Sequence, residues 1–174
     1  KASEQARPGY YAVTLRDHGV RVELTATQRV AVHRYTFAAG AAAQVLVDLQ
    51  HGLHYGDQPR VTAATVQHDA AQGEVSGVVA VKGWTEREAN FVLRFSQPIA
   101  RVDTLPPRAG EKAPRLLLGF DLGPRRTLEA RVALSTVDMA GARGNLAPDA
   151  GLPFDRVRAD AQKEWQALLA RATI

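Results

Sequence analysis

Residues 127–135 read Thr-Leu-Glu-Ala-Arg-Val-Ala-Leu-Ser, a run in which apolar and polar side chains mostly alternate. A period of two places Leu128, Ala130 and Val132 on one face of a β-strand, and Glu129 and Arg131 on the other. Similar runs recur about every ten residues from residue 10 onward, and no helix-length periodic segment interrupts them. This pattern predicts an all-β, antiparallel sandwich rather than alternating strands and helices.

The other expected strands are short and bounded by turns. Residues 10–16, the turn Asp17-His18-Gly19 and residues 20–25 form a predicted hairpin. Residues 30–37 carry apolar side chains in both phases of the alternation, which predicts either a β-bulge or burial on both faces. Further strands are expected at residues 44–49, 60–68, 74–82, 90–96, 99–102 and 115–121.

The pattern changes after Ser135. Residues 138–146 are expected to form a short helix, although Gly141 and Gly144 each disfavour it by about 1 kcal/mol relative to alanine. Pro153 suits a first helical position and opens a helix of about 20 residues. Its apolar residues recur at steps of three and four along one stripe: Phe154, Val157, Ala161, Trp165, Leu168, Leu169 and Ala172.

We therefore divide the chain into a β-sandwich, residues 1–137, and a helical segment, residues 138–174. Phe154 and Trp165 are the expected domain-packing residues, and Trp165 is the expected anchor of the long helix. The helix needs a partner surface, which is either the sandwich or a further domain. The chain also begins at Lys1 without a methionine, and we expect it to be a piece of a longer protein.

Composition excludes several classes of function. The net charge is +4, but the longest basic run is Arg125-Arg126, so we predict no nucleic-acid partner, which would need a concentrated basic patch. No stretch approaches the roughly 18 apolar residues of a membrane span. The chain has no cysteine, which excludes disulfides, thiolate metal sites and a thiol nucleophile.

Three groups of residues, in order, span nearly the whole chain. The first runs from residues 8–13 through 23–27, 29–30 and 33–37 to 48–49; the second is Gly83-Trp84 with Phe91, Phe95-Ser96 and Pro98; the third is Ser135, Val137, Ala142, Asn145-Leu146, Phe154-Asp155, Trp165 and Leu168-Leu169. In this order and spacing they resemble the N-terminal β-sandwich region of glycoside hydrolase family 92, the calcium-dependent bacterial exo-acting α-mannosidases.

The resemblance implies a galactose-mutarotase-like supersandwich with a C-terminal linker helix that packs on an (α/α)6 catalytic barrel. It implies an inverting hydrolysis, with one carboxylic acid protonating the leaving oxygen, one carboxylate activating water, and Ca2+ holding the mannose hydroxyls. In this family those groups belong to the barrel, and a glycine-rich sugar-contacting segment lies upstream of Lys1. We therefore assign no catalytic or metal-binding residue here.

As the resemblance implies, we expect the non-catalytic part of a periplasmic or secreted enzyme that trims mannose from N-glycans. Its expected partners are the C-terminal catalytic domain of the same chain and a mannose-containing glycan, and the fragment alone is expected to be inactive. Two other functions stay open. One is a self-sufficient carbohydrate-binding module with Trp84, Tyr55 or Tyr35 as the aromatic platform, and the other is a purely structural sandwich.

Individual candidate residues have plain structural interpretations. Trp84 could stack on a sugar ring, but a tryptophan before a strand more often packs in a core or domain interface. Glu86 and Glu88 are expected in a solvated turn. His51 and His54 have the spacing of a metal pair but no evident third ligand, and His33 is expected to be a hydrogen-bonded structural histidine.

Overall fold

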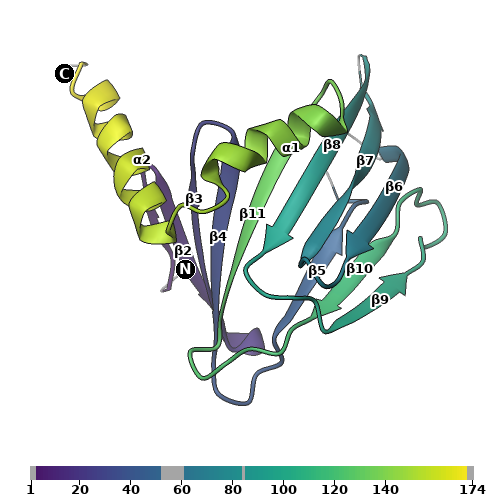
Figure 1. Cartoon of the computed structure of the whole chain (residues 1–174), viewed down its shortest axis with the longest axis horizontal. Coiled ribbons are helices and arrows are strands. Elements are labelled where there is room, and N and C mark those ends of the chain that lie inside the picture. The colour runs from purple at the N-terminus through teal and green to yellow at the C-terminus, as the bar shows by residue number, and fades with distance from the viewer. Residues whose placement is uncertain (1–2, 52–60, 84, 172–174) are drawn as a thin grey trace.

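The computed structural model describes residues 3–51, 61–83 and 85–171. Two antiparallel sheets pack face to face, and two α-helices lie on the outer face of the larger sheet (Figure 1). The fold is therefore the all-β, antiparallel sandwich with a C-terminal helix that the sequence predicts. None of the described helices is long and apolar enough to cross a membrane.

The larger sheet has eight strands. In spatial order they are β1 (Gln5–Arg7), β2 (Tyr10–Leu15), β3 (Val20–Ala26), β4 (Val30–Phe37), β11 (Thr127–Ser135), β8 (Glu86–Phe95), β7 (Glu74–Lys82) and β6 (Val61–Asp69). β11 lies between β4 and β8, with Arg131 opposite both Val32 and Arg94. The strand nearest the C-terminus thus joins the N-terminal strands to the β6–β8 meander.

The smaller sheet has three strands, β5 (Gln44–Asp48), β10 (Arg115–Gly119) and β9 (Arg101–Leu105). Leu116 and Leu118 of β10 are almost fully buried against the larger sheet. Aromatic residues fill much of the space between the sheets, and the rings of Phe95 and Phe120 lie 4.8 Å apart. This inter-sheet layer is the main hydrophobic core.

Strand β4 is buried on both faces. Phe37 faces the inter-sheet core, whereas Val30 and Val32 face the helices. Its pairing with β3 and β11 runs without a register shift, so burial on both faces, and not a bulge, explains the two apolar phases of its sequence. Strand β8 begins four residues earlier than expected, and Gln5–Arg7 forms an edge strand that the sequence pattern does not indicate.

The short helix α1 (Met139–Leu146) begins at Asp138, whose side chain accepts a hydrogen bond from the Gly141 amide. A Cβ on Gly141 would lie 2.6 Å from the Ser135 hydroxyl oxygen. The glycine that weakens the helix therefore allows α1 to pack closely on the end of β11. Two 3-10 turns, Arg16–His18 and Ala147–Asp149, complete the helical elements described.

Helix α2 (Phe154–Leu169) follows Pro153, which is its N-cap and not its first helical residue. Phe154 and Val157 are buried against β4 and α1 in a second core. Trp165, by contrast, is 48% exposed, and Leu168 and Leu169 are each 54% exposed. The described part of this chain therefore does not bury Trp165, and its expected role as an anchor on a further domain stays a prediction. The last turns of α2 extend beyond the sheet (Figure 1).

Replacing Phe154 with alanine should therefore destabilise the fold strongly. Phe154 is 0% exposed, and emptying such a site costs about 3–5 kcal/mol. Leu168→Ala, on the same helix but half exposed, is the matched control and should change the free energy of unfolding by less than about 1 kcal/mol. Urea denaturation of both variants measures the difference, and equal losses would contradict the placement of Phe154.

Candidate functional site

A row of charged residues crosses the outer face of the larger sheet. Strand pairing places Glu23 of β3 beside Arg34 of β4, and Arg34 beside Glu129 of β11. Farther along, Arg94 of β8 lies opposite Arg131 of β11 and Glu74 of β7. These side chains occupy the polar phase of their strands, on the face that α1 and α2 partly cover.

Arg34 is the centre of this row. Its guanidinium donates to Glu129 at 3.2 Å and to both carboxylate oxygens of Asp155, at 3.1 and 3.3 Å. It also lies 4.2 Å above the ring centre of Phe154, within the range of a cation–π contact. The hydrogen bond from Arg34 lowers the pKa of Asp155. Arg34 thus fixes the start of α2 to the sheet.

Glu74 joins α1 to the sheet in a similar way. Although burial opposes ionisation of its carboxyl group, hydrogen bonds from Arg143 of α1 and from Arg94 lower its pKa overall. Arg131 lies between the two clusters and donates to Glu129 and to the Leu152 carbonyl oxygen. The Nε atoms of Arg94 and Arg131 are buried without a hydrogen-bond partner.

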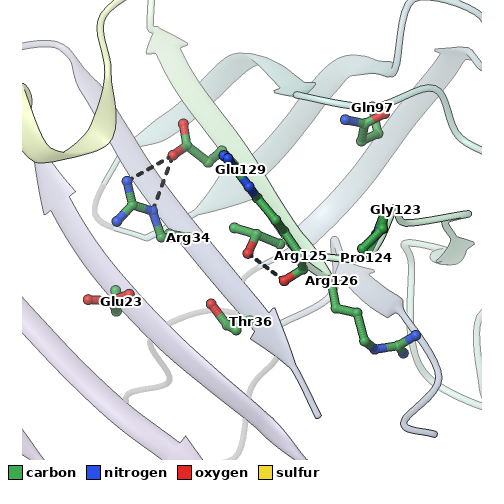
Figure 2. Close-up of a pocket in the computed structure, with 10 residues that line it drawn as sticks. Glu23, Arg34, Thr36, Gln97, Gly123, Pro124, Arg125, Arg126 and Glu129 are labelled. Atoms are coloured by element: carbon green, nitrogen blue, oxygen red, sulfur yellow. Dashed lines mark hydrogen bonds and ion pairs between the residues drawn. The ribbon is translucent and has the colours of Figure 1, made fainter. Parts of the chain in front are cut away.

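An open depression of about 780 Å3 lies where the helices leave this face uncovered (Figure 2). Its lining combines two carboxylates, three guanidinium groups and several neutral polar groups. The lining residues are Glu23, Arg34, Thr36, Gln97, Gly123, Pro124, Arg125, Arg126, Thr127 and Glu129. The set contains no aromatic side chain, so a sugar could bind here through hydrogen bonds but not by stacking.

A strained turn forms one wall of the depression. Arg126 has a φ of 49°, a left-handed conformation that costs a non-glycine residue about 1–3 kcal/mol. Its guanidinium stabilises the turn by donating to the carbonyl oxygens of Ala38 and Ala41. Figure 2 shows Arg126 pointing away from the depression, whereas the side chain of Arg125 extends along β11 toward Glu129.

Hydrogen bonds from neighbouring side chains hold the carboxylates of Glu23 and Glu129 in place. The Tyr10 hydroxyl donates to Oε1 of Glu23 at 2.6 Å, and burial together with this hydrogen bond raises the pKa of Tyr10. Glu129 accepts from Arg34 and Arg131. Within the described part of the chain, the side chains of Thr36, Gln97 and Arg125 make no hydrogen bond or ion pair, so they are available to a ligand.

The residues singled out from sequence lie elsewhere. Trp84, Tyr55 and His54 are outside the described residues. Tyr35 is not an open platform, because its ring packs on the inter-sheet core and burial raises its pKa to about 12. His33 has the predicted structural role, with Nδ1 2.8 Å from the Tyr35 hydroxyl, and burial lowers its pKa.

Glu86 and Glu88 lie in β8 and not in a turn, and both are exposed. Glu86 makes a surface ion pair with Lys82 across the β7–β8 hairpin. Sequence reasoning did not find the Glu23, Arg34 and Glu129 cluster. In the sequence, all three residues occupy polar positions of predicted strands. That alternation does not indicate that β4 pairs with β11, so it could not show that the three side chains meet.

Residues 1–135 match the profile of the glycosyl hydrolase family 92 N-terminal domain. The chain belongs to this family. It is similar to a family 92 α-mannosidase from Bacteroides thetaiotaomicron, with 26% identity and a TM-score of 0.85, and this match covers 99% of the chain and 25% of that protein. The family 92 glycosyl hydrolase ccman5 also has 26% identity, with a TM-score of 0.83, and the match covers 99% of the chain and 25% of that protein.

A family 92 inverting mannosidase from Bacteroides thetaiotaomicron VPI-5482 shares the fold, with 22% identity and a TM-score of 0.83. That match covers 98% of the chain and 23% of that protein. The chain therefore spans about a quarter of the length of these structures. No curated protein matches the chain. The family membership indicates a part of a glycoside hydrolase.

The lowered pKa of Glu74 predicts a pH-dependent contribution to stability. A carboxyl group whose pKa falls on folding stabilises the fold fully above its unfolded pKa, about 4.3 for glutamate, and less as the pH drops through the folded value. Glu74→Gln should cost about 1–3 kcal/mol at pH 7, and the deficit relative to the wild type should shrink below about pH 4. Urea titrations across this pH range measure it.

Glu86→Gln is the control for this experiment, because the Glu86 side chain is 76% exposed in a surface ion pair. Its stability should follow that of the wild type at each pH. A Glu74→Gln deficit that stays constant from neutral to acid pH would contradict the assigned role of the Glu74 carboxylate.

Proposed function

We propose that this chain is the non-catalytic N-terminal sandwich part of an exo-acting, inverting α-mannosidase, and that it braces the catalytic domain. The observation that carries the proposal is the exposed apolar stripe on the second half of α2. Trp165, Leu168 and Leu169 are each about half exposed, although a soluble helix normally turns such residues toward a packing surface. A catalytic domain of the same chain is the partner we assign to them.

The first half of α2 is firmly attached, which makes the helix suitable as a brace. Phe154 and Val157 are buried, and Arg34 pairs with Asp155. In addition, β2 begins next to the helix, since a Cβ on Gly9 would lie 2.9 Å from the backbone carbon of Ala161. The stripe beyond Ala161 is therefore held in a defined direction relative to the sheet.

Calcium, the acid and the base belong to the catalytic domain in this proposal. Calcium requires six to eight oxygen ligands, and among the described residues no three candidate metal ligands gather. We derive no catalytic step from this chain. The longer protein would act on mannose-containing N-glycans after export to the periplasm or the cell exterior.

A self-sufficient carbohydrate-binding module is the second candidate function. The polar depression beside Arg125 supports it, although Tyr35 does not supply the aromatic platform first considered. The two functions are separable, because bracing uses the far end of α2 and sugar binding would use the uncovered face of the sheet.

The isolated chain should show no α-mannosidase activity, with or without Ca2+, because the proposed acid and base lie outside it. The full-length parent should hydrolyse α-1,2-mannobiose with inversion of configuration, and chelation of calcium should abolish the reaction. NMR detection of the anomer released tests both statements. Turnover by the pure fragment would place an active site within the chain, and an inactive parent would remove the link to mannose.

Trp165→Ala tests the brace directly. In the 174-residue chain the half-exposed side chain should contribute less than about 1 kcal/mol, so the thermal midpoint should barely move. In the full-length parent, where the stripe would be covered, the same change should lower the midpoint by several degrees. Leu46→Ala is the control, because Leu46 is 52% exposed on the smaller sheet. Equally small shifts for Trp165→Ala in both contexts would contradict the proposal.

A further inference from the structure

We propose that the depression lined by Glu23, Arg34, Thr36, Gln97, Arg125 and Glu129 is a binding site for a neutral hexopyranose. This site does not include the apolar residues of the α2 stripe. The depression has three relevant features. Its carboxylate acceptors are held in place by other residues, some of its donor side chains have no hydrogen-bond partner in the described chain, and it contains both positive and negative groups.

The fixed groups are acceptors whose positions the fold determines. Glu129 is held by Arg34 and Arg131, and its backbone amide donates to the Ser96 hydroxyl oxygen at 3.0 Å. Glu23 is held by Tyr10 through one oxygen, which leaves the other carboxylate oxygen outside that bond. An acceptor positioned before the ligand arrives loses little conformational entropy on binding.

The groups without partners are mainly donors. The Arg125 guanidinium carries five N–H donors, Gln97 offers an amide with donor and acceptor, and Thr36 a hydroxyl. Arg125 is set in place by the strained turn at Arg126, which is tied to the Ala38 and Ala41 carbonyl oxygens. Strain of this kind gathers at functional sites, and here it borders the depression.

Charge selects the ligand class. Glu23 and Glu129 would repel an anion, whereas Arg125 and Arg34 would repel a cation. A neutral ligand with many hydroxyls avoids both repulsions, because each hydroxyl can donate to a carboxylate oxygen and accept from a guanidinium N–H. The lining lacks an aromatic side chain, so the affinity for one sugar ring should be weak, in the millimolar range.

The test is an NMR titration of the 15N-labelled 174-residue chain with methyl α-D-mannopyranoside. We expect saturable amide shifts centred on residues 36, 97 and 123–129. Arg125→Ala should weaken binding by about fivefold or more, and Gln97→Ala should weaken it by about twofold or more. Neither side chain has a partner in the fold, so both variants should keep the wild-type spectrum elsewhere and the wild-type unfolding midpoint.

Arg108→Ala is the matched control, because Arg108 is an exposed arginine in the loop between β9 and β10 and does not line the depression. It should bind the sugar as the wild type does. The absence of saturable shifts up to several hundred millimolar sugar would overturn the proposal, as would unchanged binding by Arg125→Ala. Arg125-dependent shifts with sodium sulfate but not with the sugar would also overturn it, since they would define an anion site.

These outcomes are independent of those for the brace, whereas the second candidate function, a carbohydrate-binding module, rests on the same depression and would be contradicted with it. Loss of sugar binding leaves the brace intact, because Trp165 and its neighbours do not line this depression. In the same way, a result that contradicts the brace would not affect the sugar titration, because the titration uses the 174-residue chain without further domains.

Discussion

The burial of both faces of β4 is the constraint on which the rest of the structure depends. Phe37 must be covered by the smaller sheet, and Val30 and Val32 must be covered by helices. A two-sheet sandwich can satisfy only the first requirement, so α1 and α2 are needed on the outer face. Burying a side chain such as Phe154 contributes about 1.5–3 kcal/mol. The exposed part of the Arg34–Asp155 pair contributes about 0–1 kcal/mol, so packing holds α2 and the ion pair sets its direction.

The same face carries charge where it is not covered by helix. On the outer face of β11, Glu129 and Arg131 precede the buried Ala133. Glu129 accepts hydrogen bonds from Arg34 and Arg131, and Arg131 also donates to the Leu152 carbonyl oxygen in the loop before α2. Arg34 belongs to both environments, since it pairs with Asp155 of α2 and with Glu129 at the depression. The Arg34 guanidinium therefore contacts both the first turn of α2 and the depression proposed to bind a sugar. The contacts of Arg34 thus help to position both the start of α2 and the lining of the depression.

Local patterns in the sequence were sufficient for much of this fold. Residues 74–82 and 127–135 form strands at the predicted bounds, because apolar residues recur along both runs and glycine-containing turns precede them. The edge strand Gln5–Arg7 is fully exposed, and its side chains therefore carry no alternation to read. Trp165 lies on a genuine helical stripe, but a stripe shows which residues share a face and not whether this chain covers that face. The Glu23, Arg34 and Glu129 cluster depends on the pairing of β4 with β11, in which Arg34 and Glu129 are 95 residues apart in sequence, and no local pattern encodes that pairing.

Helix α2 has two halves that differ in burial, separated near Ala161. Before that point it completes the second core, where Phe154 and Val157 are buried against the larger sheet and α1. After it, the apolar residues continue with the same helical period but are about half exposed, and Trp165 and Leu168 line an open depression beside the N-terminal strands without being buried there. Exposed Trp and Leu side chains weaken the solubility of an isolated chain without stabilising it. Their presence on a helix whose start is so firmly fixed follows naturally if the covering surface belongs to another domain, and the quarter-length match to the family 92 structures leaves room for that domain.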